Sequence, residues 1–381
     1  MISLRLLVGR SVLTRPRSRS KRSTASRRRF ARSAICYGVV AYLVTTVAMN
    51  FVIDTARPEW RDPEYGQRLA QIRQLQAESP HRPMILFVGS SRVQMGILPE
   101  AMAFEDKPDS PLPYNLGYRG AQPPAIALQV LRLIDAGHKP AAVVVEYCPA
   151  VMLSWGGPHS LPKVWPNRLS VADLTRLRQL GANGDSTPFT SWTRPVWANA
   201  AVPWSNYRLT LLNYWLPELV PLEQLKNMDP ERIERFGFRG SPHQNPTPEQ
   251  RTASMKISQQ SYKRLFTRTV SNQASHEAMV ALVNRCRAEG IPIAFMHAPE
   301  SATFRSWFSP ESIAAGNSIA DYLRREMGVP VFPAPDHLEE NDFADGYHLM
   351  RHGAEKYSRW LADTHIKPWW TSQRLAGTGS R

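Results

Sequence analysis

The apolar positions beyond residue 80 follow two alternating patterns. Continuous apolar runs, which are typical of buried parallel strands, occupy residues 84–88, 114–116, 142–147, 291–297 and 329–332. Apolar residues at helical spacing fall between them, over residues 99–105, 124–136, 273–289, 309–327 and 350–363. The alternation predicts an α/β fold in which helices cover both faces of a parallel five-stranded sheet.

The stretch from residue 150 to about 250 interrupts this alternation. It is rich in proline and holds six of the eleven tryptophans, namely Trp155, Trp165, Trp192, Trp197, Trp204 and Trp215. Long unstructured segments are uncommon inside compact domains, so we expect an ordered insertion with helices near 170–180 and 206–216. The insertion leaves the carboxyl end of a predicted strand, where open α/β sheets bind ligands. It is therefore a lid or a wall of a cleft, or else a packing layer or a membrane-facing surface.

The N-terminal region has a different pattern. An uncharged run of 20 residues, 34–53, follows a basic segment. As a helix this run spans about 30 Å, the thickness of a bilayer's hydrocarbon core, and predicts one transmembrane helix. The four arginines within 27–32 are expected to hold the N-terminus in the cytoplasm and to place the rest of the chain outside it. A cleaved signal peptide and a twin-arginine export signal are the alternatives.

The charge of the chain agrees with a membrane location. The formal net charge is +15, and residues 1–33 hold eleven Lys and Arg and no Asp or Glu. The remaining residues carry 36 basic and 32 acidic side chains, so they are nearly balanced. A free basic tail can bind nucleic acid, but a tail beside a membrane span is explained by the lipid bilayer. We therefore expect a membrane partner and no nucleic acid.

These patterns divide the chain into five parts. We expect a basic cytoplasmic tail at 1–33, a transmembrane helix at 34–53, a stalk helix within 54–80, an α/β domain at 81–365 and a tail at 366–381. The stalk helix starts at Asp62-Pro63, an N-cap residue followed by a first-turn proline. It either packs on the domain or leads into it.

Cysteine and metal chemistry are not indicated. Three cysteines do not make a disulfide framework, and nothing in the sequence supports a pairing of Cys148 with Cys286. The sequence has no clustered metal ligands, no phosphate-binding loop and no dinucleotide-binding glycine pattern. We expect no metal and no cofactor.

A serine follows the first predicted strand in a tight turn. The strand ends in Gly89-Ser90-Ser91-Arg92, and glycine permits a sharp turn. Ser91 then opens the next segment, where free backbone N–H groups can stabilise an oxyanion. Ser90 is the rival nucleophile by position.

An Asp-x-x-His motif precedes the last predicted helix. Asp345 and His348 are three residues apart, so their side chains can lie on one side of a turn and Asp345 can orient the imidazole. A serine, a histidine and an aspartate are the parts of an acyl-transfer site. His352 and His297 are rival bases, and Asp342 is a rival carboxylate.

The order of these segments resembles the SGNH/GDSL hydrolase superfamily over residues 84–150 and 270–365. The resemblance implies a three-layer α/β/α, flavodoxin-like domain with Ser91 as nucleophile and Asp345 and His348 as its partners. It also implies an oxyanion hole formed by the N–H groups of Ser91 and Gly120, since Gly120 ends the matching stretch 115–120. The likeness is closest to membrane-anchored extracytoplasmic members, the group around the alginate O-acetylation proteins and the D-alanine transfer protein of teichoic acids.

The chain departs from the family pattern at two places. Gly-Asp-Ser is replaced by Gly-Ser-Ser, and Gly-x-Asn-Asp is missing where residues 146–149 read Glu-Tyr-Cys-Pro. The side-chain donor of the oxyanion hole is therefore unaccounted for, and its loss typically costs about 10²–10³ in rate. The residues expected to replace it or to bind substrate are Arg92, Arg119, Tyr147 and His297.

The expected function is that of a membrane-anchored serine esterase or O-acyltransferase outside the cytoplasm. The resemblance implies acyl, in particular acetyl, esters of cell-surface polysaccharide as substrates. Because acetyl-coenzyme A is cytoplasmic, transfer would require a membrane protein as acyl donor. The alternative is a catalytically inactive relative that binds glycan through the Trp-rich insertion.

The membrane topology can be tested directly. Reporter fusions after residue 60 should be active only when the reporter requires an extracytoplasmic location, because the basic cluster holds the N-terminus inside. Fusions after residue 30 serve as the cytoplasmic control. Activity of a cytoplasmic reporter fused after residue 60 would contradict this topology.

Overall fold

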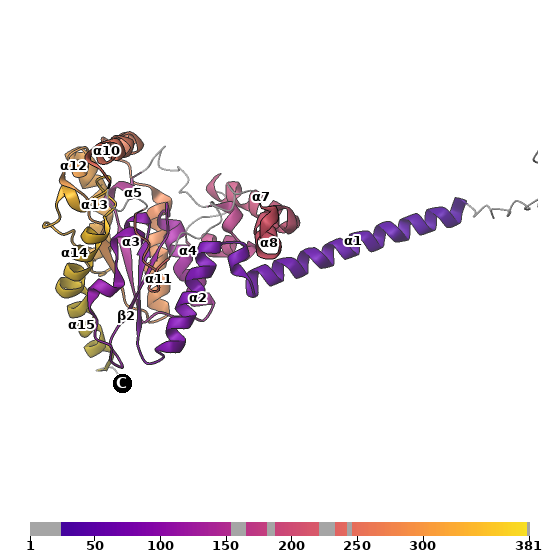
Figure 1. The fold of residues 1–381 in the computed structure, drawn as a ribbon, viewed down its shortest axis with the longest axis horizontal. Helices are drawn as coiled ribbons and strands as arrows, with labels where there is room; N and C mark the ends of the chain where they lie inside the picture. The colour runs from indigo at the N-terminus through magenta and orange to yellow at the C-terminus, as the bar shows by residue number, and fades with distance from the viewer. Residues whose placement is uncertain (1–23, 154–164, 181–186, 221–232, 242–245, 379–381) are drawn as a thin grey trace, which may run out of the picture. The chain divides into compact units, whose positions relative to one another are not determined.

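The computed structural model describes residues 24–153, 165–180, 187–220, 233–241 and 246–378. The chain divides into two compact units, Met1–Met49 and Asn50–Arg381 (Figure 1). Helix α1 (Thr24–Thr55) supplies the described part of the first unit and ends in the second. The segment Ser26–Thr55 is long and apolar enough to cross a membrane. A signal sequence near an N-terminus meets the same criteria of length and composition.

The second unit contains a sheet of five parallel strands. They are β1 (Met84–Gly89), β2 (Leu112–Gly117), β3 (Ala142–Tyr147), β4 (Ile293–His297) and β5 (Val331–Phe332). Their order is β2-β1-β3-β4-β5, with Phe87 paired to Asn115 on one side and to Val144 on the other. The expected α/β fold with a five-stranded parallel sheet is confirmed. The connections after β1 and β3 leave in opposite directions, and the carboxyl ends of strands at such a switch point are where open α/β sheets bind ligands.

One face of the sheet packs on the largest hydrophobic cluster. Alternate residues of a strand point to opposite faces, and Leu86, Val88, Val145 and Phe295 point into this cluster. The helices that contribute to it include α2 (Pro63–Glu78), α4 (Pro123–Asp135), α6 (Val171–Gln179), α11 (Gln273–Ala288) and α13 (Pro310–Arg325). Helix α2 is the expected stalk helix, and it packs on the domain.

The other face packs on a second cluster, which contains Ile85, Phe87, Val144 and Met296. The helical segments on this face are α3 (Ser91–Gly96), η2 (Pro99–Met102), α14 (Arg351–Leu361), the π-helical turn η7 (Ala362–Ile366) and α15 (Lys367–Thr378). Figure 1 shows α14 and α15 in sequence along this side of the sheet.

The expected tail at 366–381 differs from the structure. Residues 367–378 form α15, and Ile366 and Trp369 are buried in the second cluster. Because this segment has a polar composition, its two large apolar side chains that cover the sheet were not expected to be buried. The α/β domain therefore continues beyond residue 365.

A third, aromatic cluster lies around the segments that follow β3 and β4. Tyr262 and Phe304 form its centre, with ring centroids 5.1 Å apart. The cluster is built on α5 (Pro149–Met152), α10 (Pro248–Tyr262), η5 (Lys263–Leu265) and α12 (Ala302–Arg305). Helix α10 was not expected from the sequence.

The insertion is helical in its described parts. It contains η3 (Pro166–Arg168), α6, α7 (Thr187–Ala201), α8 (Pro203–Trp215) and η4 (Pro217–Leu219). Helices α6 and α8 match the two expected helices, whereas α7 contains Pro195 and was not expected. Leu177 and Trp192 are buried in the first cluster, so part of the insertion is a packing layer. Trp155 lies outside the described residues.

The buried position of α15 gives a stability prediction. Trp369 is 8% exposed, so Trp369→Ala should lower the free energy of unfolding by about 3–5 kcal/mol. Leu375→Ala on the same helix is the control, because Leu375 is 69% exposed and its truncation should cost less than about 0.5 kcal/mol. Denaturant unfolding of both variants measures the difference. Equal stability of the two variants would mean that α15 does not pack on the sheet.

Candidate active site

The turn after β1 presents Ser91 at the start of α3. Ser90 is the N-cap of this helix, and its hydroxyl accepts a hydrogen bond from the N–H of Arg92 at 3.2 Å. Ser91 is partly exposed, and the N–H of a first helical residue has no intrahelical acceptor. Gly89 is required at the turn because a Cβ there would collide with Val93 and Glu146.

The loop between β5 and α14 presents Asp345 and His348. The loop follows η6 (Glu340–Asp342) and is closed by a hydrogen bond from the N–H of Ala344 to the carbonyl of His348, at 2.9 Å. Gly346 has φ +91°, a left-handed conformation that favours glycine. The Oδ1 atom of Asp345 accepts the N–H of His348 at 2.9 Å.

Ser91, His348 and Asp345 form a continuous hydrogen-bonded chain. The Nε2 atom of His348 lies 2.7 Å from the Oγ atom of Ser91, and its Nδ1 atom lies 2.7 Å from the Oδ2 atom of Asp345. With its proton on Nδ1, the imidazole donates to Asp345 and accepts from Ser91. The side chains of His348 and Asp345 are 15% and 18% exposed, so both are partly accessible to solvent.

The electrostatics of the site favour a charged Asp345. Burial opposes ionisation of this carboxyl group, but the attraction of His348 and the hydrogen bonds of the turn outweigh burial. Together they lower the pKa of Asp345 below its ordinary value. A charged Asp345 fixes the imidazole and stabilises it when it takes up a proton.

The rival residues have other partners. His352 interacts with the carbonyl of Asn341 at 3.1 Å and with Asp342, whose carboxylate also binds Lys356. His297 lines a separate pocket of about 170 Å³, and burial lowers the pKa of its imidazole to about 4. Of these histidines, His348 is the one that contacts Ser91.

Glu146 is a site residue that sequence reasoning did not assign. Its carboxylate accepts the hydroxyl of Ser90 at 2.9 Å and also the N–H of Ser90. The side chain is 4% exposed, and burial raises its pKa. Ser90 is thus fixed on Glu146, which leaves Ser91 as the serine that faces the imidazole. A single acidic residue within the apolar run 142–147 was the signal that could have identified it.

Arg92 and Tyr147 were expected to bind substrate, but the structure gives both of them internal partners. Arg92 is 3% exposed, pairs with Glu300 at 2.7 Å and lies 4.7 Å from the ring centroid of Tyr347. The Tyr147 hydroxyl donates to the carbonyl of Gly316 and accepts the N–H of Ala320. Arg92 therefore braces α3 against the loop that carries His348, and Tyr147 secures α13.

Gly120 and Arg119 lie in the loop after β2, and both are exposed. The N–H of Tyr118 donates to the carbonyl of Gly89 at 2.8 Å, which ties this loop to the turn of Ser91. Gly120 has φ +69°, and a Cβ placed on it would lie 3.4 Å from the ring of Trp165. The loop therefore runs beside the turn that carries Ser91, with Trp165 from the insertion packed against it.

Asn115 fixes α3 to the same loop. Its Nδ2 atom donates to the carbonyl of Val93 at 2.8 Å and to that of Ile97 at 2.6 Å, and its Oδ1 atom accepts the N–H of Gly117 at 2.8 Å. The side chain is fully buried. One amide thus holds together the short helix of Ser91 and the segment that leads to Gly120.

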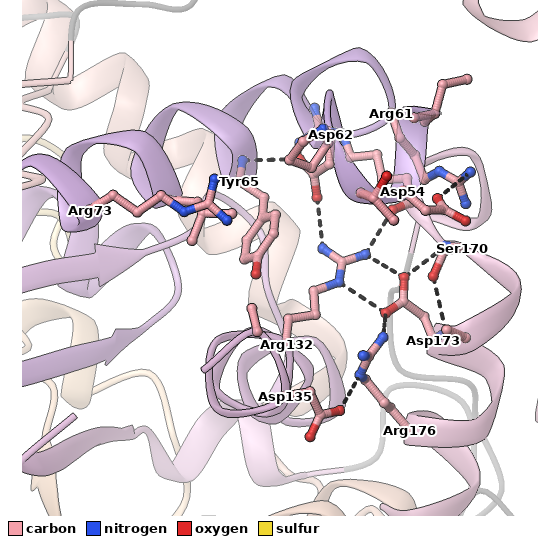
Figure 2. A pocket seen from close by; sticks show the side chains of 17 residues that line it. Asp54, Arg61, Asp62, Tyr65, Arg73, Arg132, Asp135, Ser170, Asp173 and Arg176 are labelled. Atoms are coloured by element: carbon pink, nitrogen blue, oxygen red, sulfur yellow. Dashed lines mark hydrogen bonds and ion pairs between the residues drawn. The ribbon is translucent and has the colours of Figure 1, made fainter. Parts of the chain in front are cut away.

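A charged pocket of about 370 Å³ is lined by Asp62, Arg132 and Asp173, among other residues. Figure 2 shows Arg132 between Asp62 and Asp173, at distances of 3.1 and 2.8 Å. Asp62 also accepts the hydroxyl of Tyr118 at 2.8 Å. Burial opposes ionisation of Asp173, but Arg132 outweighs it and lowers the pKa of this carboxyl group. The buried charges satisfy one another, so we assign this pocket to the support of the Tyr118 loop.

Comparison with known proteins gives no relative: no family model matches the chain, and no curated protein is significantly similar to it.

Within the part of the chain that the structure describes, no group of three or more metal-ligating side chains occurs. Cys148 and Cys286 are both free and buried, so they do not form a disulfide. The interpretation of the site depends on the hydrogen-bonded chain from Ser91 to Asp345.

The nucleophile can be identified by covalent labelling. A fluorophosphonate probe should label the full chain at Ser91, because His348 can remove the proton from this hydroxyl. Ser91→Ala should abolish labelling, whereas Ser90→Ala should retain it. Circular dichroism confirms that both variants are folded. Persistent labelling of Ser91→Ala would place the nucleophile elsewhere.

Proposed function

We propose that this chain is a membrane-anchored serine esterase or O-acyltransferase with a three-layer α/β/α domain of the SGNH type. The observation that carries the proposal is the hydrogen-bonded chain of Ser91, His348 and Asp345 beside the carboxyl edge of the sheet. The strand order β2-β1-β3-β4-β5 supports it, because it is the flavodoxin-like order with its crevice between β1 and β3.

In the proposed acylation step, the Nε2 atom of His348 removes the proton of Ser91 as the Oγ atom attacks the ester carbonyl carbon. The carbonyl π electrons move to oxygen, and the N–H groups of Ser91 and Gly120 stabilise the oxyanion. The imidazolium then gives its proton to the departing alcohol oxygen as the C–O bond breaks. Charged Asp345 stabilises the imidazolium throughout.

In the proposed deacylation step, water or a sugar hydroxyl attacks the acyl-serine carbonyl. His348 takes the proton of the attacking group and gives it to the Oγ atom of Ser91 as the bond between the acyl carbon and Oγ breaks. Water gives hydrolysis, and a hydroxyl of a cell-surface polysaccharide gives O-acyl transfer. An acetyl donor outside the cytoplasm requires a membrane protein as its source.

Glu146 supports a second candidate, a catalytically inactive glycan-binding relative. The family pattern places an asparagine donor after the third strand, and a buried carboxylate on Ser90 cannot replace an N–H donor. Loss of one donor costs about 10²–10³ in rate. The hydrogen bond between Ser91 and His348 is the contact that a serine nucleophile needs with its base, and it is the reason that we prefer the enzyme.

We propose that α1 is a retained anchor with the N-terminus in the cytoplasm and the catalytic domain outside. The basic segment before the apolar run supports this orientation. A domain held at the membrane surface suits an acyl donor that is itself delivered through the membrane.

Asp345 gives a kinetic prediction. Asp345→Asn should lower kcat/KM for an aryl acetate by up to ~10⁴, because the imidazole loses its orientation. The lowered pKa keeps wild-type Asp345 charged in mild acid, so loss of this carboxylate's charge should not limit kcat/KM there.

The control is Asp363→Asn, which removes an exposed carboxylate that pairs with Lys367. Its kcat/KM and pH profile should match those of the wild type. Adding a sugar acceptor to the wild type separates hydrolysis from transfer. Wild-type kcat/KM in Asp345→Asn would mean that Asp345 only shapes the turn.

A further inference from the structure

Large apolar side chains are exposed on α7, α8 and η4. They are Trp197, Val202, Tyr214, Trp215, Leu216 and Leu219, which we call the α7–α8 patch. Trp215 is 60% exposed and Leu219 is 62% exposed. The rings of Tyr214 and Trp215 contact each other, with centroids 5.6 Å apart, and Leu216 and Leu219 follow them in the chain. Neighbouring exposed apolar side chains mark a surface that contacts a partner.

The patch is attached to the end of α1. The Nδ2 atom of Asn50 donates to the carbonyl of Ala200 at 2.7 Å, at the end of α7. The ring of Trp60, in η1 (Pro58–Trp60), lies 5.8 Å from that of Tyr214 and 5.5 Å from that of Trp215. All of these residues belong to the unit Asn50–Arg381. The patch therefore adjoins the residues at which the apolar helix ends.

We propose that the α7–α8 patch rests in the interfacial layer of the bilayer that α1 crosses. The inference rests on the part of the proposed function that makes α1 an anchor, and it is independent of the catalytic step. A helix that leaves the hydrocarbon near Ile53 places the groups bound to its last turns at the depth of the lipid headgroups. Any apolar surface held at that depth meets lipid before it meets another protein.

The composition of the patch fits this layer. Tryptophan and tyrosine concentrate at membrane interfaces, where the ring is in an apolar environment and the N–H or O–H group remains hydrated. Arg57 lies 5.6 Å from the ring of Tyr214, and Arg194 and Arg208 are exposed on α7 and α8. These cations suit anionic headgroups. The exposed polar residues of α8 prevent deeper insertion, so the helix lies on the membrane and does not span it.

The test uses the full chain with Cys36→Ser, because Cys148 and Cys286 are buried and resist labelling. An environment-sensitive fluorophore is attached at Trp215→Cys, and the protein is placed in anionic lipid nanodiscs at one copy per disc. Lipids that carry a nitroxide near the headgroup should quench this fluorophore. A fluorophore at Glu355→Cys, an exposed position on α14, should retain its emission.

A third fluorophore at Val44→Cys reports the anchor itself, since Val44 lies within the apolar run and is 62% exposed. Nitroxides deep in the acyl chains should quench it. Quenching at residue 44 without quenching at residue 215 would contradict the lipid contact of the α7–α8 patch and leave the proposed anchor intact. Absence of quenching at both positions would contradict the anchor and the lipid contact together. The esterase assay is unaffected by either result.

A second variant guards against local misfolding. Leu219→Cys places the fluorophore on η4 in the same patch and should show the same quenching as residue 215. If the emission at both positions depended on the number of copies per disc and not on the nitroxide lipid, the patch would bind a second copy of the chain. That result would overturn the lipid assignment.

Discussion

The backbone N–H and the hydroxyl of Ser90 both donate to the buried carboxylate of Glu146, and this contact joins the central strands β1 and β3 at the turn that carries Ser91. Movement of the turn would remove the partners of Glu146, and a buried carboxylate without partners costs several kcal/mol. The turn therefore has little freedom to move. Gly89 belongs to the same constraint, because a side chain there would displace Glu146. The position of Ser91 relative to His348 depends on this arrangement. It also explains why two adjacent serines have different roles.

The segment that follows the apolar helix is an integral part of the domain. In α2, Arg68 donates to the carbonyl of Asn115 at 2.7 Å, and Glu64 accepts the amide of Gln94 at 2.8 Å. Asn115 belongs to β2, the strand paired with β1, and Gln94 belongs to α3, the helix that begins at Ser91. A displacement of α2 would therefore alter the geometry of the site. Of the two alternatives for the expected stalk helix, packing on the domain is the one that the structure shows.

Much of the fold could be predicted because its signals are local. The run 142–147 is apolar and continuous, so it predicted β3 with the same bounds. Ser91, Asp345 and His348 could be singled out because a glycine turn and a three-residue spacing are visible in sequence. The partners of Arg92 and Glu146 could not be foreseen, since they come from segments far away in the chain. Helix α7 was missed because Pro195 within it reads as a helix breaker.

The hydrogen bond between Ser91 and His348 spans 257 positions of the sequence. At a synthesis rate of about 5–20 residues per second, the histidine leaves the ribosome roughly 10–50 s after the serine. During that interval the serine is an ordinary hydroxyl, and strand β5 and the loop that carries the base do not yet exist. The hydrogen bond on which the proposed acyl transfer depends can form only after the loop with His348 has been made and has docked on the sheet.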